Sequence, residues 1–275
     1  MRIYKSKIIR KYYQYANRSH SYIGNICIFE NIRILVNTQM PKQVIILFGP
    51  PGAGKGTQSE LLSEKMGLYL FETSKILERE FKSVEEMPTD APDRFVEVEG
   101  EKFDVLNEKE IWKQGQLCSP PWVTYLTMKE LTRLHDEGDN IILSGSPRTV
   151  YEAEREMPLI SQLYGKENIH IILIEISAEV TVFRNTHRKI CELMRHSILF
   201  NKETEKLKIC PLDGSKLVKR KDLDDPETIK TRLVQYEERT LPLFEYFKNN
   251  GFNVNKISGE GSVAQVHGSI LKILE

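Results

Sequence analysis

A glycine-rich segment at residues 49–58 contains the residue types that hold a phosphate group. It reads Gly-Pro-Pro-Gly-Ala-Gly-Lys-Gly-Thr-Gln. Glycines let successive backbone N–H groups curl around a phosphate, and the N-terminus of a following helix adds the positive end of its dipole. In the general pattern a Ser or Thr follows the lysine directly, whereas here Gly56 intervenes and Thr57 supplies the hydroxyl. We predict a nucleotide phosphate site in which Lys55 reaches the β and γ phosphates. The predicted binding residues are Gly52, Ala53, Gly54, Lys55, Gly56 and Thr57.

Alternating strands and helices are predicted to position this loop. The continuous apolar run at residues 44–48 is typical of a strand buried on both faces of a parallel sheet. Further strands are expected at 68–71, 140–144, 169–176 and 252–257, and helices at 57–66, 123–136, 151–163, 178–188 and 226–248, with a last helix after Ser262. This order predicts an α/β fold with a doubly wound parallel sheet. Ligands bind outside the carboxyl ends of strands in such sheets, so we expect Arg148, which follows the 140–144 strand, to lie at the ligand.

Two segments interrupt the alternation. Residues 83–101 are acidic and carry Pro88 and Pro92, so they are expected to form a loop or an insertion. Residues 189–223 are polar, lack periodicity and contain two of the four cysteines. Both segments are long for connections in a compact domain, and such segments often act as functional lids.

The overall composition excludes several classes of protein. The 39 basic and 39 acidic residues cancel, which argues against a globally basic nucleic-acid binder. No uncharged apolar run approaches the roughly 18 residues of a membrane helix. Four cysteines are too few for a disulfide scaffold, so a reducing compartment is predicted, here the cytoplasm.

Residues 1–40 form a basic N-terminal extension. Their seven basic side chains and one acid give a formal charge of +6, which leaves −6 for residues 41–275. Three interpretations stay open: an organellar presequence, a basic arm that contacts a polyanion, and an extension with no catalytic role. We favour the third, because the segment has five tyrosines rather than the amphipathic arginine spacing of a presequence.

Five motifs together resemble one known family. The run at 49–58, with glycine after its lysine, resembles the adenylate kinase branch of the nucleoside monophosphate kinases. Residues 144–149, Ser-Gly-Ser-Pro-Arg-Thr, are similar to that family's Asp-Gly-Phe-Pro-Arg-Thr, and residues 240–243, Thr-Leu-Pro-Leu, to its Thr-Ala-Pro-Leu. The remaining matches are arginines: Arg184 and Arg188 resemble a phosphate-clamping pair, and Arg220-Lys221-Asp222 with Arg232-Leu233 resembles a lid-closing segment. The resemblance covers roughly residues 42–275.

The resemblance implies a five-stranded P-loop domain at 41–275 with a monophosphate-binding insertion at 73–115 and a lid at 189–223. It implies transfer of the γ-phosphoryl group of ATP, bound with Mg²⁺, to AMP or another nucleoside monophosphate. It also implies a monomer that binds ATP and the monophosphate but neither nucleic acid nor membrane. Phosphoryl transfer needs positioning and charge neutralisation more than covalent chemistry from the protein. The cations expected to supply this are Lys55, Arg148, Arg184, Arg188, Arg220 and Arg232, with Arg184 also binding ATP. The residues expected at the acceptor are Thr73, Gly145, Arg148 and Glu152.

The acceptor side departs from the family pattern. The family's Thr-Gly-Asp is Thr73-Ser74-Lys75 here, and Glu78 stands where an arginine is expected. The glutamine that reads adenine in the family aligns with Glu152. A carboxylate only accepts hydrogen bonds, whereas an amide also donates. Either Glu152 recognises the two N–H donors of a guanine edge, or this position no longer reads a base.

A second hypothesis for the function follows from these departures. Ser144 replaces the family's aspartate, which holds magnesium through water, and a serine contributes no negative charge. Together with Lys75 and Glu78, this keeps open a nucleotide-binding regulatory relative with little transferase activity.

The cysteines of residues 189–223 are candidates for a metal site. Some members of the family hold the lid with zinc, bound by two Cys-x-x-Cys pairs or by a variant that ends in Asp. Cys210 and Asp213 match the second pair in its Asp form, whereas Met194 replaces the partner of Cys191. A thioether is a poor zinc ligand, and His196 two residues away is a suitable one. The predicted set is Cys191, His196, Cys210 and Asp213, and a metal-free lid that keeps remnants of the site is the alternative.

Overall fold

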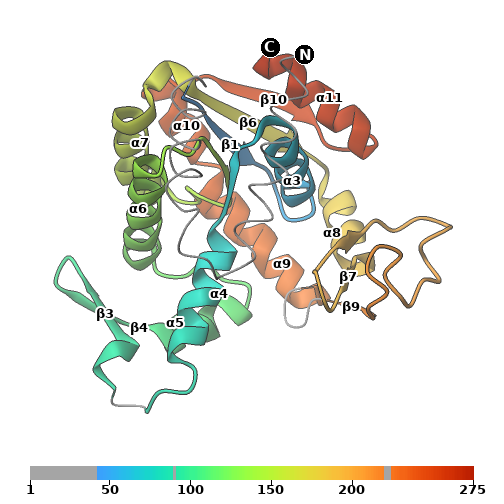
Figure 1. Cartoon of the computed structure of the whole chain (residues 1–275), viewed down its shortest axis with the longest axis horizontal. Coiled ribbons are helices and arrows are strands. Elements are labelled where there is room, and N and C mark those ends of the chain that lie inside the picture. Colours follow the sequence, from blue (N-terminus) through green and yellow to red (C-terminus); the bar gives the residue numbers. More distant parts are fainter. Residues whose placement is uncertain (1–41, 89–90, 220–223) are drawn as a thin grey trace, which may run out of the picture.

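A five-stranded parallel sheet forms the centre of the protein (Figure 1). The computed structural model describes residues 42–88, 91–219 and 224–275, so the basic extension at 1–40 and Arg220 lie outside the described residues. The strand order is β10 (Val254–Ser258), β6 (Ile169–Glu175), β1 (Val44–Phe48), β5 (Ile141–Ser144) and β2 (Tyr69–Glu72), and each neighbouring pair is parallel. The predicted doubly wound α/β fold is therefore confirmed.

Helices connect the strands and cover both faces of the sheet. They are α3 (Lys55–Met66), α6 (Pro120–Asp136), α7 (Val150–Tyr164), α8 (Ala178–His187), α9 (Pro226–Gln235), α10 (Leu243–Asn249) and α11 (Val263–Leu274). None of the described helices combines the length and the apolar character that crossing a membrane requires.

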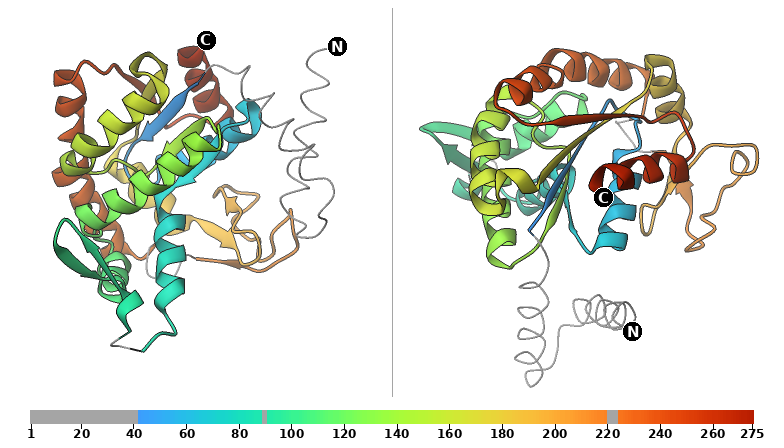
Figure 2. Two further views of the ribbon diagram at one scale, coloured as in Figure 1. Left: turned by 60° about the vertical axis from the view of Figure 1, so that its left-hand side comes forward. Right: turned by 90° about the horizontal axis from the view of Figure 1, so that it is seen from above.

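The central strand β1 supplies side chains to two hydrophobic cores. Val44, Ile46 and Phe48 point to the core formed with α6, α7 and α10. Ile45 and Leu47 point to the opposite core, formed with α3 and α11. Figure 2 shows α3 and α11 together on one side of the sheet. Successive strand side chains point to opposite faces, so burial on both faces explains why this strand is apolar at every position.

A helical arm, here named the α4–α5 arm (residues 73–115), projects at the lower left of Figure 1. It consists of α4 (Thr73–Val84), the hairpin of β3 (Phe95–Val98) and β4 (Glu101–Asp104), and α5 (Val105–Lys113). Residues 83–101 were expected to form a loop or an insertion. They lie in this inserted arm, but the loop alternative is wrong at β3, where four residues with one glutamate are too few to show an alternating pattern. The hairpin turn places Glu99 against α7, where its Oε2 accepts from Tyr151 Oη at 3.0 Å.

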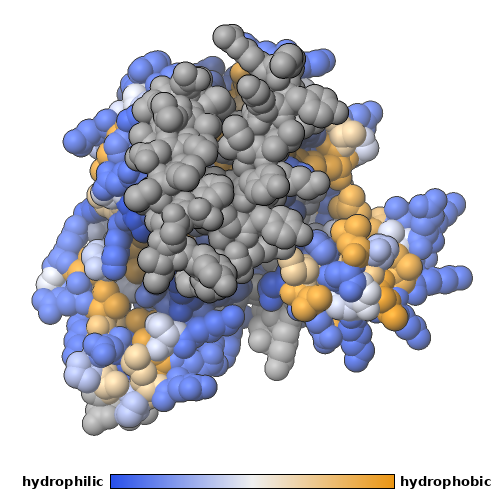
Figure 3. All heavy atoms as spheres, in the orientation of Figure 1, coloured by the Kyte–Doolittle hydropathy of each residue, from blue (hydrophilic) through white to orange (hydrophobic). Residues whose placement is uncertain are grey.

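A second projection, here named the β7–β9 knuckle (residues 189–218), lies at the right of Figure 1. The strands β7 (Lys189–Cys191), β8 (Ser197–Ile198) and β9 (Leu217–Val218) form a small antiparallel sheet in a segment that showed no periodicity in the sequence. Strands of two or three residues are too short to produce a pattern. Several apolar side chains of the knuckle are exposed and gather at this end of the molecule (Figure 3): Leu193, Met194, Leu199, Ile209 and Leu212.

The expected single helix at 226–248 is wrong. The chain forms α9, then a π-helical turn at Tyr236–Thr240, then α10. Pro242 has no N–H to continue the ladder and its ring crowds the carbonyl one turn back, so the bond from Leu241 N to Tyr236 O spans five residues. The break turns Thr240 inward, where it is buried.

The central strand sets the stability of the domain, and we predict that Ile46→Ala lowers the free energy of unfolding by about 2–5 kcal/mol. Ile46 is fully buried, so the substitution leaves a cavity. Val182→Ala on α8, where the side chain is 39% exposed, is the control and should change it by less than about 0.5 kcal/mol. Urea denaturation followed by circular dichroism measures both, and equal losses would contradict this account of the core.

Candidate functional site

The glycine-rich loop connects β1 to α3 at the carboxyl edge of the sheet. Gly54 caps α3 in the left-handed conformation with φ 93°. A Cβ at Gly49 would lie 2.4 Å from the carbonyl oxygen of Ile174, so no side chain fits there. These two positions require glycine, and they give the loop the tight curl that anion-binding backbone loops need.

Lys55 is the first residue of α3, and its ammonium group lies over the loop. Its Nζ donates to Gly49 O at 2.6 Å and to Pro50 O at 2.9 Å. The same side chain lines a cleft at this edge of the sheet. The lysine therefore stands between the loop and the cleft, and its contact with the β and γ phosphates stays a prediction.

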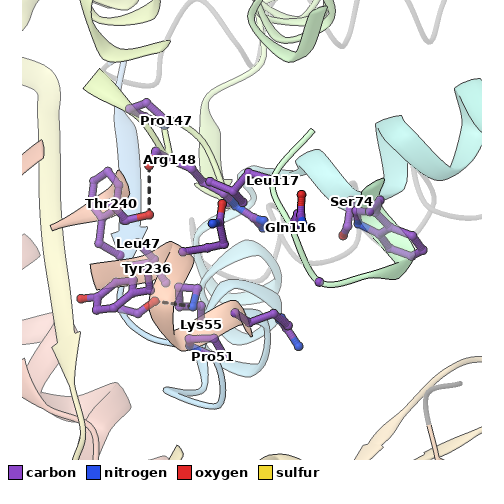
Figure 4. A pocket seen from close by; sticks show the side chains of 17 residues that line it. Leu47, Pro51, Lys55, Ser74, Gln116, Leu117, Pro147, Arg148, Tyr236 and Thr240 are labelled. Carbon is purple, nitrogen blue, oxygen red and sulfur yellow. Dashed lines mark hydrogen bonds between the residues drawn. The ribbon is translucent and has the colours of Figure 1, made fainter. Parts of the chain in front are cut away.

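Arg148 approaches the cleft from the loop after β5. Thr240 Oγ1 donates to Arg148 O at 2.9 Å (Figure 4), so the π-helical turn fastens this loop. Gly145 has φ 105°, and a Cβ there would lie 2.8 Å from Arg148 Nη2. Burial lowers the pKa of the Arg148 guanidinium, although a guanidinium stays charged in proteins. The cation is thus held partly desolvated, where its interactions with an anion are stronger.

Several of the predicted site residues line one cleft. Lys55, Arg148 and Arg232 lie around it, together with Gly145, and Figure 4 shows Lys55 and Arg148 at the same opening. A smaller cavity adjoins it and is lined by Thr73, Gly145, Arg148 and Glu152. Both are also lined by Ser74 and Trp112 of the α4–α5 arm and by Gln116 and Leu117, the two residues that follow the arm.

Other predicted cations lie outside the lining of the cleft. Arg184 donates to Gly52 O at 3.3 Å and to Gly259 O at 2.9 Å, so it joins the phosphate loop to the segment after β10. Arg188 pairs with the buried Asp224 at 2.8 Å.

The structure shows where the residues that depart from the family pattern lie. Glu78 lies 4.0 Å from Arg195 of the β7–β9 knuckle, and Lys75 forms an ion pair with Glu72. Ser144 ends β5, opposite Leu47 of β1. Glu152 is almost fully buried and accepts hydrogen bonds from Arg148 N at 2.7 Å and Thr149 Oγ1 at 3.0 Å.

The sequence did not identify the wall of the cleft formed by Trp112, Gln116 and Tyr236. Trp112 belongs to α5, Gln116 follows it, and Tyr236 begins the π-helical turn. One signal was present, because Gly115 has φ 78° and a Cβ there would lie 2.7 Å from Thr228 Cγ2. The glycine thus permits close approach of α9 to the residues after α5.

The four predicted metal ligands of the β7–β9 knuckle are brought together. Their ligand atoms lie within 4.8 Å of one another. Nδ1 of His196 is 3.5 Å from the sulfur of Cys191, 3.6 Å from that of Cys210 and 3.2 Å from Oδ2 of Asp213. Hydrogen bonds from Cys191 and then from Ser215 lower the pKa of Asp213, which favours its ionised form. Two thiols, an imidazole and a carboxylate at these separations fit a tetrahedral zinc ion.

The fold and the cleft define a class of protein. A glycine-rich loop leads from the central strand of a doubly wound sheet into a helix, and cations from three elements face one cleft at the carboxyl edge. These are the features of a P-loop nucleotide-binding protein.

Comparison with known proteins gives the family. A family model described as adenylate kinase matches residues 47–252. The adenylate kinase of Oceanobacillus iheyensis is 34% identical over 233 residues, which are 84% of this chain and 98% of the relative. That of Clostridium botulinum strain Langeland is 33% identical over 232 residues, 84% of this chain and 97% of the relative. The chain belongs to the adenylate kinase family, and it is an ATP-binding nucleotide kinase by class.

The contact between Gly145 and Arg148 gives a prediction about the acceptor side of the cleft. Gly145→Ala should displace the guanidinium and raise the KM of the acceptor roughly tenfold or more, with a smaller effect on the KM of ATP. Gly100→Ala is the matched control, because Gly100 also has a positive φ, 83°, but has nothing within 4 Å of the added Cβ. Steady-state kinetics measures both variants, and equal effects would show that backbone strain alone is responsible.

Proposed function

We propose that the protein transfers the γ-phosphoryl group of MgATP to a nucleoside monophosphate, with AMP as the first candidate acceptor. The observation that carries this proposal is the shared cleft of Lys55, Arg148 and Arg232, which continues into a cavity beside the α4–α5 arm. A donor triphosphate on the glycine-rich loop and an acceptor in the smaller cavity would meet between these cations.

The chemistry of the step assigns a role to each side chain. An oxygen of the acceptor phosphate attacks the γ phosphorus, the bond to the bridging oxygen of the β phosphate breaks, and ADP leaves with that electron pair. Lys55 holds the donor phosphates, Arg148 holds the acceptor phosphate, and Arg232 stabilises the group in transit. Fixed cations in a partly desolvated cleft stabilise the charge that develops on the phosphoryl oxygens.

The remaining arginines have supporting roles in this proposal. Arg184 already bonds to the carbonyl groups of Gly52 and Gly259, so it shapes the phosphate loop from behind. Arg188 would exchange its contact with Asp224 for a phosphate when the segment at 189–223 closes over ATP. Four expectations from the sequence stay predictions: a role for Arg220, motion of the insertions at 73–115 and 189–223, a monomeric state and a cytoplasmic location.

AMP is favoured over GMP as the acceptor. The similar proteins are named adenylate kinases. Arg148 N, Thr149 Oγ1 and Ser146 Oγ all donate to the Glu152 carboxylate. These internal bonds support the interpretation that Glu152 holds the loop after β5 and does not read a base.

An assay of ADP formation from ATP with AMP, GMP, CMP or UMP tests the proposed function. We expect turnover with AMP and a preference for AMP over GMP. A preference for GMP would instead support the hypothesis that Glu152 recognises the guanine edge. Nucleotide binding without turnover of any acceptor would favour the regulatory alternative.

The role of Lys55 gives a further prediction. Lys55→Met should lower kcat by about 10²- to 10³-fold, because one fixed cation is lost from the transition state while the glycines of the loop remain. Lys65→Met is the control, since Lys65 is an exposed lysine in the last turn of the same helix. A loss of activity of the same size in both variants would contradict the role of Lys55.

We also propose that the β7–β9 knuckle holds a structural zinc ion through Cys191, His196, Cys210 and Asp213. The support is the convergence of four ligand atoms of suitable chemistry in a segment with only three short strands. A closed four-ligand site supplies folding free energy and no reaction chemistry.

Metal analysis of the purified protein should find one zinc ion per chain. Cys191→Ser should remove it and lower the melting temperature. Cys118→Ser should retain it, because Cys118 is also buried but does not belong to the four-residue cluster. Protein without stoichiometric zinc would support the metal-free alternative.

A further inference from the structure

Two buried carboxyl groups lie one helical turn apart beneath the acceptor cavity. Glu152 and Glu156 are on α7, and their exposed fractions are 2% and 0%. Buried carboxyl groups are ordinarily paired with cations or kept neutral. Among the described residues, the Arg148 guanidinium is the cation whose charge lowers the pKa of Glu152. The charge that affects Glu156 is that of the Glu152 carboxylate, and it raises the pKa of Glu156.

The hydroxyl of Ser146 joins the two carboxyl groups. Its Oγ lies 3.0 and 2.9 Å from the two oxygens of Glu156 and 3.3 Å from Oε2 of Glu152. A serine hydroxyl has one proton to donate and two lone pairs that accept. It can therefore donate to only one of the two carboxyl groups, so the other must bring a proton of its own.

The hydrogen bonds around each carboxyl group decide which one is protonated. Burial raises the pKa of Glu152, but the hydrogen bonds from Arg148 N and Thr149 Oγ1 and the nearby Arg148 guanidinium oppose this rise and favour the ionised form. Glu156 has Ser146 as its one hydrogen-bond partner among the described residues. Burial, and then the charge of Glu152, raise the pKa of Glu156 well above its ordinary value. The hydrogen bonds and the burial together favour the protonated form at Glu156 rather than at Glu152.

We propose that Glu156 is a positioning residue of the acceptor site, a neutral acid that donates to Ser146 Oγ, which in turn donates to the carboxylate of Glu152. This proposal rests on the function proposed above. The chain of two hydrogen bonds orients Glu152, and Glu152 holds the backbone N–H of Arg148 at 2.7 Å. The neutral form leaves one negative charge next to Arg148, so the guanidinium remains available to an acceptor phosphate.

Substitutions of Glu156 separate this role from simple packing. Glu156→Gln keeps a neutral donor of the same shape, so the KM of AMP should stay within about twofold of wild type. Glu156→Met fills a similar volume without a donor and should raise the KM of AMP roughly tenfold, with the KM of ATP unchanged. The methionine variant should not be less stable, because an apolar side chain replaces a buried polar one. Glu154→Gln, at an exposed position on the same helix, is the control for changes on α7.

A double substitution tests whether the effect passes through the serine. Ser146→Ala should raise the KM of AMP to the same degree as Glu156→Met, and the double variant should be no worse than either single one, because both remove the same connection. Additive losses, an unchanged KM of AMP in Glu156→Met, or equal rises for AMP and ATP would each overturn the proposal.

An infrared spectrum tests the protonation state without any assay of turnover. Wild-type protein at neutral pH should show the carbonyl stretch of a protonated carboxylic acid, and Glu156→Gln should lose it. Absence of that band in the wild type would overturn the proposal even if every variant folds. Affinity for AMP, measured by calorimetry, replaces KM if no turnover is found. Intact binding without turnover would reject the proposed function alone, and loss of binding in Glu156→Met would still support the role of Glu156.

Discussion

The requirement to hold several cations close together at one edge of a sheet governs the rest of this structure. Like charges held close together repel, and three of the cations at this edge are stabilised by carbonyl dipoles or by a carboxylate. Lys55 donates to the carbonyl groups of Gly49 and Pro50, and Arg184 to those of Gly52 and Gly259. Arg188 instead pairs with a buried carboxylate. The apolar sheet supplies a rigid base on which these dipoles are fixed before a polyphosphate arrives.

On the acceptor side, a carboxyl group balances the positive charge of Arg148. A second ionised carboxylate beside Glu152 would exceed the single positive charge of Arg148 and compete with the phosphate of the acceptor. A hydroxyl placed between two acids lets one of them remain neutral at low energetic cost. The substitutions that distinguish this chain from the family pattern thus include Ser146, which makes a hydrogen-bonded connection that an aromatic side chain cannot make.

The sequence predicted the parts of this structure that depend on local patterns. The buried strand at Val44–Phe48 and the glycine-rich loop were recognised because apolar runs and required glycines can be identified within about ten residues of sequence. The helix break was missed although Pro242 is itself a local signal that a helix ends or kinks. The β3–β4 hairpin was missed because the charged residues of β4 hide the alternating pattern of a strand. The cleft wall at Trp112 and Gln116 arises from packing of the α4–α5 arm against the core, which residue types alone do not encode. The four ligands of the knuckle could be grouped because ligand chemistry restricts the choice of side chains.

The buried Gln58 at the start of α3 links the helix of the phosphate loop to a distant part of the chain. Its Nε2 donates to the carbonyl oxygen of Val263, the first residue of α11, at 3.0 Å, across 205 residues of sequence. The support of the phosphate loop therefore extends to a helix that does not line the cleft. A substitution in α11 can change the position of this loop without touching a nucleotide.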